Sequence, residues 1–347
     1  MSGGTGLVVK THAFGDAMLT TPAVRELLAR GSDSRWLALS GPSAAPVWER
    51  FPGIESVHIA PFPPPCGAAG RFRLMIWSVR ASRVLRSVTR AFVFHSSPGV
   101  RRWVRFLTGA PLVSGGDRPL GNWEDARGFN PARFAGESYA EIAGVSPGSW
   151  QPEFASTPTE LAMAGELLPA GRWVAMAPAG GKNPRDTVLR KRWGIEGFIE
   201  IADRLIDRGF GILLLGGSED RAVSETLTAG LSYGADRIVD MTGRTDWGGT
   251  AALLRVGGFF VGNDSGTAHA AVAAGARAVV VFGPTDPSCL YAPGSVNPVV
   301  SVSSCAPCYS NSVFPGCSRP GHDCMFSVTA DDVWTVVERV LDEDNSS

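Results

Sequence analysis

The stretch Gly262–His269 (GNDSGTAH) has the residue types of a phosphate-binding turn. Apolar residues precede it at Phe259–Val261 and follow it at Ala270–Ala274, which predicts a buried strand, a polar turn and a helix. The first N–H groups of a helix have no partner within the helix, so they bind anions. We therefore expect a phosphorylated or nucleotide ligand beyond the carboxyl ends of the strands. The residues expected at the phosphate are Ser265, Gly266 and Thr267.

The elements that must position this turn alternate along the chain, with short apolar runs typical of strands between helical segments. This alternation predicts parallel sheets with helices on both faces. The predicted strands are Leu7–Lys10, Trp36–Leu39, Val57–Ile59, Ala91–Phe94, Leu112–Val113, Trp173–Ala177, Ile212–Leu215, Ile238–Asp240, Gly258–Val261 and Ala278–Phe282. The predicted helices are Ala17–Arg30, Glu196–Arg208, Glu219–Ala229, Trp247–Arg255 and Ala330–Leu341. Gly115–Arg133 has no clear period and is expected to form an exposed loop.

The length of 347 residues exceeds what one hydrophobic core usually supports, so two domains are expected. A Ser-, Pro- and Gly-rich stretch at Val145–Pro158 is typical of a linker between them. We therefore predict domains at residues 1–155 and 156–329, followed by a last helical segment at 330–347. No targeting segment and no apolar run of membrane-spanning length is recognised, so a cytoplasmic location is expected.

Positive charge is concentrated in the first half of the chain, although the net charge is only −1. Between Glu55 and Asp117 there are nine arginines and no acidic residue. The spacing of Arg80, Arg83, Arg86 and Arg90 predicts that they share one face of a helix, with Val79, Val84, Leu85 and Val88 largely on other faces. Such a face is either solvated or a surface for an anionic acceptor or anionic membrane headgroups. No nucleic-acid-binding motif accompanies it, so nucleic acid is not an expected partner.

Four cysteines lie close together near the C-terminus, namely Cys305, Cys308, Cys317 and Cys324. One Cys-x2-Cys pair followed by two further thiols is compatible with structural zinc, with two disulfides, or with reduced thiols. A cytoplasmic location disfavours stable disulfides.

The order of four segments resembles that of glycosyltransferase family 9, the ADP-heptose:lipopolysaccharide heptosyltransferases. The matching segments are Val8–Pro22 with its Gly15-Asp16 turn, Ala177–Gly180 running to Lys191–Trp193, Leu215–Asp220, and Gly262–His269 continued to Phe282–Pro287. The resemblance implies the GT-B architecture, in which two Rossmann-like domains face a central cleft and the last helix crosses back to the first domain. It also implies transfer with inversion, with no metal or other cofactor in the chemical step. The implied donor is ADP-heptose and the implied acceptor is the lipopolysaccharide inner core.

Two catalytic residues are predicted on this basis. The family's proposed base lies at the Gly-Asp position, so Asp16 is expected to take the proton of the acceptor hydroxyl. Lys191 is expected to stabilise the negative charge that develops on the diphosphate. Arg190 and Arg192 flank it, so either of these cations could take that role, and Lys182 is a looser candidate in the same loop.

The remaining predicted contacts are with the donor and the acceptor. Asp264 is expected to accept hydrogen bonds from the donor sugar or to cap the helix, and His269 to contact the phosphate or donor rather than only the backbone. Glu219 is expected to bind the ribose hydroxyls, with Asp220 as the alternative. Thr187 is a weaker candidate for a phosphate contact. The predicted acceptor-binding residues are Arg71, Arg73, Arg80 and Arg83.

Other functions remain compatible with these residues. The same chemistry could serve a small-molecule acceptor, and a nucleotide-sugar epimerase could share the architecture. A catalytically silent sugar-nucleotide-binding protein and a zinc-stabilised interaction protein are further alternatives. Loss of turnover in Asp16→Ala with donor binding kept would favour the enzyme over the binding protein.

Overall fold

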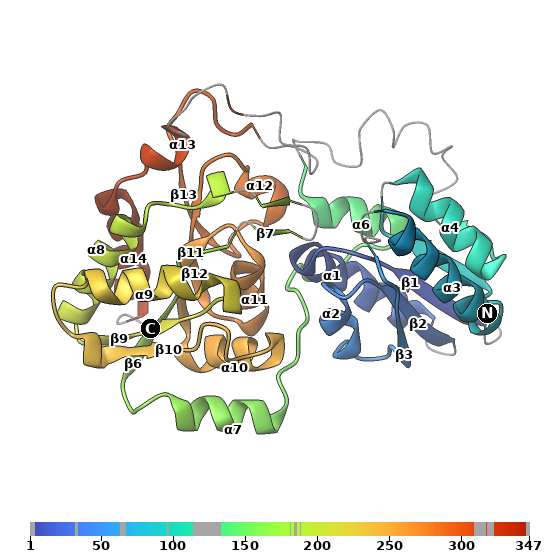
Figure 1. Ribbon diagram of the computed structural model, residues 1–347, viewed down its shortest axis with the longest axis horizontal. Coiled ribbons are helices and arrows are strands. Elements are labelled where there is room, and N and C mark those ends of the chain that lie inside the picture. Colours follow the sequence, from blue (N-terminus) through green and yellow to red (C-terminus); the bar gives the residue numbers. More distant parts are fainter. Residues whose placement is uncertain are drawn as a thin grey trace. The chain divides into compact units, whose positions relative to one another are not determined.

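The protein is described by a computed structural model that divides into two compact α/β units (Figure 1). The first comprises Met1–Phe154 with Ser288–Ala292, and the second Ala155–Pro287 with Pro293–Ser347. The described residues are 4–31, 34–62, 67–95, 97–113, 133–180, 182–183, 186–187, 189–308, 317 and 323–344. The loop predicted at Gly115–Arg133 lies outside them except for Arg133.

The first unit is built on a parallel sheet in the spatial order β3-β2-β1-β4-β5. Its strands are β1 (Thr5–Val9), β2 (Arg35–Ser40), β3 (Ser56–Ile59), β4 (Arg90–Val93) and β5 (Leu112–Val113). Both faces of the central strand β1 are buried, as expected where helices cover a parallel sheet on both sides.

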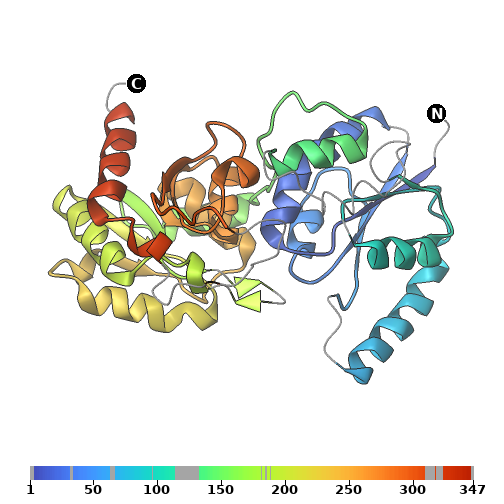
Figure 2. The ribbon, with the colours of Figure 1, turned by 90° about the horizontal axis from the view of Figure 1, so that it is seen from above.

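Two pairs of helices cover the opposite faces of this sheet, as Figure 2 shows. The helices are α1 (Phe14–Arg30), α2 (Ala45–Glu49), α3 (Ala68–Leu85), α4 (Pro98–Thr108) and α6 (Ala135–Ala143). Helices α1 and α6 pack together on one face, and α3 and α4 on the other. Leu7 and Val9 of β1 form a core with Leu85 of α3 and with Val104 and Leu107 of α4.

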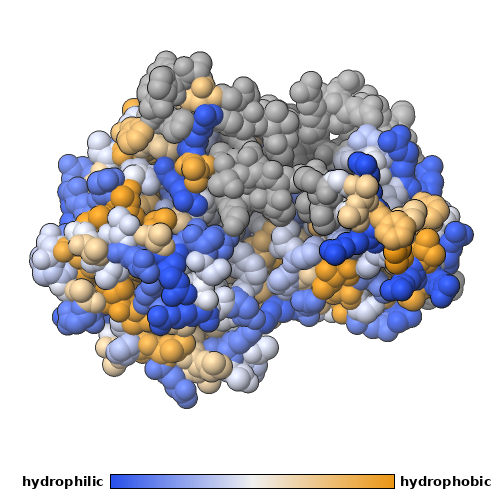
Figure 3. All heavy atoms as spheres, in the orientation of Figure 1, coloured by the Kyte–Doolittle hydropathy of each residue, from blue (hydrophilic) through white to orange (hydrophobic). Residues whose placement is uncertain are grey.

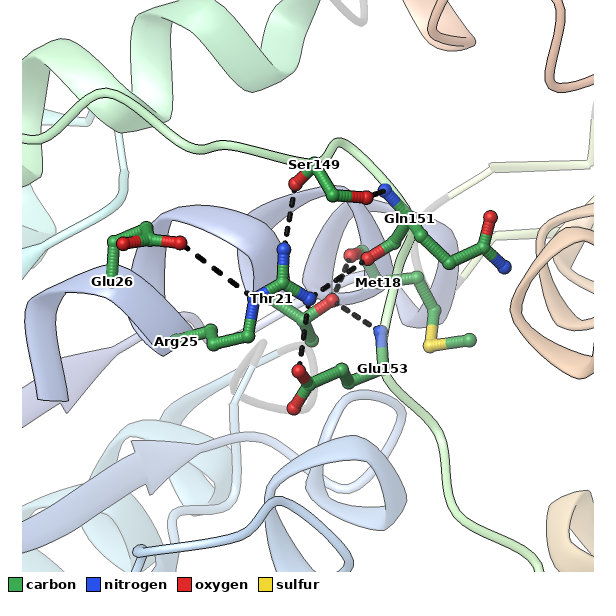
Figure 4. A network of polar contacts seen from close by, with 7 residues as sticks. All are labelled: Met18, Thr21, Arg25, Glu26, Ser149, Gln151 and Glu153. Atoms are coloured by element: carbon green, nitrogen blue, oxygen red, sulfur yellow. Dashed lines mark hydrogen bonds and ion pairs between the residues drawn. The ribbon is translucent and has the colours of Figure 1, made fainter. Parts of the chain in front are cut away.

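The segment that follows α6 is fastened to α1 by Arg25 (Figure 4). The Arg25 guanidinium donates to the carbonyls of Ser149 (2.6 Å) and Gln151 (3.3 Å) and to Oε1 of Glu153 (2.9 Å). The Glu153 N–H donates to Oγ1 of Thr21 at 2.8 Å. Within the first unit, these bonds hold the chain against the helix that carries Asp16.

The second unit contains a parallel sheet in the order β10-β9-β6-β11-β12-β13. Its strands are β6 (Arg172–Ala177), β9 (Phe210–Leu214), β10 (Ile238–Asp240), β11 (Phe259–Asn263), β12 (Arg277–Phe282) and β13 (Asn297–Val300). In chain order this is the strand arrangement 3-2-1-4-5-6 of a dinucleotide-binding fold. Such folds bind ligands where the order reverses, which here lies between β6 and β11.

Helices also cover both faces of the second sheet. The helices of this unit are α7 (Pro158–Leu167), α8 (Ile195–Asp207), α9 (Arg221–Gly230), α10 (Trp247–Gly257), α11 (Gly266–Ala274), α13 (Asp323–Phe326) and α14 (Ala330–Asp344). The short helix α12 (Pro287–Leu290) belongs to the first unit except for Pro287. Buried side chains of α8, α9 and α14 form one core with the sheet, including Phe198, Leu227 and Val337. Helix α10 packs against α7, α11 and β6.

The final helix, α14, packs within the second unit. It contacts α8, β12 and β13, and Arg277 donates to the Val340 carbonyl at 2.6 Å. Its apolar side chains complete the core of the second sheet. That this last helical segment crosses back to the first domain stays a prediction.

Some local predictions also need correction. Helix α3 ends at Leu85, so Arg90 does not lie on it but begins β4. Lys182–Asn183 (β7) and Asp186–Thr187 (β8) form a short antiparallel pair where a loop was predicted. Short 3-10 helices lie at Leu189–Lys191, Ser218–Asp220 and Ala235–Arg237. In the described part of the chain, every helix is too short or too polar to cross a membrane.

Candidate active site

Asn263 at the end of β11 holds together the loops at the strand-order reversal of the second sheet. It bonds to the loop after β6 and to the segment that carries Lys191. The Asn263 side chain is fully buried. Its Nδ2 donates to the carbonyls of Pro178 (2.9 Å) and Ala179 (3.0 Å), and its Oδ1 accepts from the Trp193 N–H (2.9 Å). One amide thus fixes the loop after β6 and the loop that carries Lys191. The sequence analysis did not single out Asn263, although it stands within the predicted turn.

Gly180 brings the first of these loops against the start of α11. Its φ of +103° lies in the region that favours glycine, and a Cβ there would stand 2.9 Å from Cβ of Ser265. Glycine is therefore required at position 180, because of its positive φ and because a side chain would collide with Ser265.

Lys191 and Asp264 form an ion pair beside the start of α11. Lys191 Nζ lies 2.5 Å from Asp264 Oδ2, and Oγ1 of the buried Thr285 donates to the same oxygen at 2.9 Å. Burial by itself would raise the pKa of Asp264, but the charges of Lys191 and His269, with the two hydrogen bonds, hold that pKa below its usual value. Asp264 is therefore a buried carboxylate anion that orients Lys191.

The start of α11 has the features of an anion site. Ser265 has extended backbone angles and its side chain makes no capping bond. Its Oγ is buried and has no hydrogen-bond partner among the residues that the structure describes. The first N–H groups of the helix, beginning at Gly266 and Thr267, are free of intrahelical bonds by geometry. His269, 7% exposed, lies one turn into the helix.

The other predicted residues of this region have contacts of their own. Arg192 donates from Nε to the Gly180 carbonyl at 2.8 Å and lies 3.6 Å from Asp220, so it secures the loop. Asp220 also accepts the Gly217 N–H at 3.0 Å, whereas Glu219 is exposed. The side chains of Lys182 and Thr187 lie outside the described residues, although their backbones pair across β7 and β8.

In the first unit, Asp16 lies in the opening turn of α1, just beyond β1. Its Oδ2 accepts the Ala13 N–H at 3.1 Å. Lys10 is buried below it, donates to the Tyr139 hydroxyl at 2.8 Å and stands over the Tyr139 ring. Burial lowers the pKa of Lys10, an effect that the charge of Asp16 opposes, whereas burial and Asp16 together raise the pKa of Tyr139.

Aromatic rings surround the same end of the first sheet. The His12 ring stacks on Phe62 with centroids 5.6 Å apart and meets His95 edge-on at 4.7 Å. Phe62 in turn stacks on Trp103 at 5.7 Å. The sequence analysis did not identify this cluster, because its members come from four separate segments.

The predicted acceptor-binding arginines all lie exposed on α3: Arg71, Arg73, Arg80 and Arg83. Val79 and Val84 of the same helix are also exposed, each 51%, rather than turned inward. The apolar and basic residues of α3 therefore share its outer surface.

The C-terminal cysteines lie near one another, since they affect each other's pKa. Cys305, Cys308 and Cys324 carry free thiols. Burial and the neighbouring cysteines raise the pKa of Cys308 and that of Cys324. Among the residues that the structure describes, no three potential ligands are placed to hold a metal ion.

A model of glycosyltransferase family 9 (heptosyltransferase) matches residues 139–313, half of the chain. The lipooligosaccharide heptosyltransferase 2 of Haemophilus ducreyi is 34% identical over 101 residues, which cover 28% of this chain and 29% of the relative. The lipopolysaccharide heptosyltransferase 2 of Escherichia coli is 30% identical over 98 residues, 28% of each protein. The chain thus aligns with less than a third of the length of these relatives.

Solved structures match almost the whole chain. The ADP-heptose lipopolysaccharide heptosyltransferase II of E. coli has a TM-score of 0.74 at 19% identity, covering 98% of this chain and 99% of that one. A family 9 glycosyltransferase from Veillonella parvula has a TM-score of 0.80 at 17% identity, covering 99% and 98%. An E. coli heptosyltransferase solved with ADP has a TM-score of 0.68 at 19% identity, covering 96% and 99%.

These likenesses confirm the predicted GT-B fold class. The family model also bears out the resemblance recognised in the sequence. The chain belongs to glycosyltransferase family 9, the heptosyltransferase family.

Proposed function

We propose that this protein is an inverting glycosyltransferase that moves a heptose from an ADP-activated donor to an acceptor hydroxyl of the lipopolysaccharide inner core. Membership of family 9 supports the reaction type, and the names of its relatives support the donor and acceptor. The single observation that carries the proposal is the Lys191–Asp264–Thr285 cluster at the start of α11. It combines a fixed cation with unpaired helix N–H groups, as departure of a diphosphate requires.

In the proposed reaction, the acceptor hydroxyl attacks the anomeric carbon on the face opposite the phosphate. The Asp16 carboxylate takes the hydroxyl proton as the new carbon–oxygen bond forms. The bond between the anomeric carbon and the phosphate oxygen breaks, and its electron pair leaves on the nucleoside diphosphate. Lys191 and the α11 N–H groups stabilise that charge, so no metal is needed in this step.

The proposed donor contacts build on the same framework. Ser265 Oγ, which lacks a partner within the described part of the chain, would donate to a diphosphate oxygen, and His269 would add a contact one turn further along. Glu219, which is exposed after β9, would accept from the ribose hydroxyls. Asp264 would act mainly through Lys191, because its Oδ2 already accepts two bonds.

Calorimetric titration with ADP-, GDP-, UDP- and TDP-sugars, followed by mass spectrometry of the products, tests this proposal. We expect selective binding of the adenine nucleotide and heptose transfer to an inner-core acceptor that persists in EDTA. Asp16→Asn should reduce turnover about 10²- to 10⁴-fold with donor affinity kept, whereas the exposed Asp207→Asn should leave both unchanged. Selective binding of a non-adenine nucleotide would contradict the donor assignment, and transfer only to a small molecule would contradict the acceptor assignment.

Structural zinc at Cys305, Cys308, Cys317 and Cys324 stays a separate prediction. Elemental analysis of the purified protein decides it. One zinc per chain, lost in Cys308→Ser, would establish the site, and its absence in protein purified without chelator would reject it.

A further inference from the structure

Helix α3 of the first unit presents an apolar stripe to the outside. Phe72 is 57% exposed, Met75 54%, Ile76 37% and Val79 51%. Their spacing places these four side chains on one face of the helix. The opposite side of α3 packs on the unit through Ser78 and Leu85, which are buried. The helix is therefore anchored on one side and apolar on the other.

Arginines accompany this stripe on the same outer surface. Arg71, Arg73, Arg80, Arg83 and Arg86 are all exposed. No acidic residue occurs from residue 56 to residue 116, so no carboxylate of α3 or of the adjacent α4 balances them. Figure 3 shows hydrophobic side chains gathered with hydrophilic ones on this part of the surface.

The neighbouring helix α4 also exposes an apolar side chain beside arginines. It packs against α3, with Trp103 Nε1 donating to Ser78 Oγ at 2.8 Å. On its outer side Phe106 is 57% exposed, and Arg102 and Arg105 are exposed as well. A second helix thus repeats the combination of an apolar side chain with arginines.

We propose that α3 is a membrane-docking helix that lies in the surface of an anionic phospholipid bilayer. The apolar stripe would enter the boundary between headgroups and acyl chains, and the arginines would pair with lipid phosphates. An apolar face bordered by arginines is the pattern of helices that lie on a membrane. A nucleic acid would pair with the arginines but would leave the apolar stripe exposed to water. A partner protein whose surface carries charges of both signs would not complement a surface that has arginines and no carboxylates.

This inference deepens the proposed function, because a docked α3 would bring the first unit to an acceptor held in the bilayer. It can be tested without that function, since vesicle binding requires neither donor nor acceptor. A failure to bind vesicles and a failure to transfer heptose are therefore separate results.

Co-sedimentation of the full chain with vesicles tests the proposal, using phosphatidylcholine alone and phosphatidylcholine with phosphatidylglycerol. The triple variant Phe72→Gln, Met75→Gln, Ile76→Gln removes most of the stripe while keeping a residue of good helix propensity. Arg80→Gln and Arg83→Gln reduce the charge. The matched control is Met163→Gln with Leu167→Gln on α7, where the side chains are 57% and 42% exposed without nearby arginines in the helix.

We expect the wild type to bind the anionic vesicles, and to bind them more weakly as salt is raised. Each arginine change should weaken binding about fivefold, the triple variant should lose binding at least about tenfold, and the α7 control should bind as the wild type does. Circular dichroism checks that each variant is folded. Absence of wild-type binding, or equal binding by the folded triple variant, overturns the proposal. So does a concentration-dependent dimer in sedimentation that the triple variant abolishes, because a second copy would then cover the stripe.

Discussion

Lys191 Nζ lies 2.5 Å from Oδ2 of Asp264, although 73 residues separate them in the chain. Thr285 donates to the same carboxylate oxygen, and the side chains of Lys191 and Asp264 are 13% and 4% exposed. A buried pair of this kind is costly to break on one side only, and it holds the ammonium at a defined place beside the start of α11.

The first prediction separates the catalytic role of Lys191 from its structural role. Lys191→Met should lower kcat about 10²- to 10³-fold and should also cost about 3 kcal/mol of unfolding free energy, because Asp264 keeps a buried charge. The double variant Lys191→Met, Asp264→Asn should regain most of that stability but none of the activity. Steady-state kinetics and urea unfolding measure the two effects, with Arg190→Met as the neighbouring-cation control. If Lys191→Met retained wild-type kcat, the leaving-group role would belong to another cation.

The second prediction uses the hydroxyl of Ser265, which is buried and makes no hydrogen bond to any described residue. Ser265→Ala should weaken ADP binding about tenfold while leaving stability equal or slightly higher, because an unsatisfied polar group is removed. Ser224→Ala is the matched control, since that buried hydroxyl lies 2.7 Å from Thr242 Oγ1. The control should lose stability and keep its ADP affinity. Calorimetry and thermal unfolding test both, and unchanged ADP affinity in Ser265→Ala would rule out the phosphate contact.

The third prediction concerns pH and Lys10, whose pKa burial lowers from 10.5. Between the folded-state pKa and 10.5 the unfolded chain holds the extra proton, so the folded state gains stability as pH rises. The pKa of Tyr139 is raised from 10.0, so above pH 10 its ionisation in the unfolded chain lowers the stability of the folded state as pH rises. Relative to Lys10→Met, the wild type should therefore gain unfolding free energy from neutral pH toward pH 10. Urea unfolding at several pH values measures the difference, and a difference that falls over this range would contradict the prediction.

The fourth prediction concerns the Arg25 contacts that fasten residues 149–153 to α1. Arg25→Met should cost about 1–2 kcal/mol, since charge-assisted hydrogen bonds to three groups are lost. Arg30→Met, which removes a single bond to the Gly144 carbonyl on the same helix, should cost less. Equal losses in the two variants would show that the three-way contact adds nothing.

Local sequence patterns were sufficient for the turn at Gly262–His269. The apolar run at Phe259–Val261 predicted β11, and the helix predicted after the turn is α11, which ends at Ala274 before the left-handed Gly275. Both depend on interactions within a few residues, which sequence periodicity records. The partners of Asn263 were not predictable in this way, because they lie about 70 and 85 residues away along the chain.

For helix α3, the sequence predicted the element but not which of its sides is exposed. Its arginine spacing predicted a charged helix face, but the exposure of Phe72 and Met75 depends on which side packs against the sheet and α4. Likewise, the sequence predicted a last helix at Ala330–Leu341, whereas the packing of α14 against α8, β12 and β13 places it with the second sheet.

The sequence by itself therefore determined the α/β alternation, the strand, turn and helix around Gly262–His269 and the family, because these depend on local spacing and short motifs. The tertiary structure alone decided that Asp264 orients Lys191, that the buried Lys10 pairs with Tyr139, and that the stripe on α3 faces outward. Each of these depends on contacts between distant segments, which form only when the sheets assemble and exclude water.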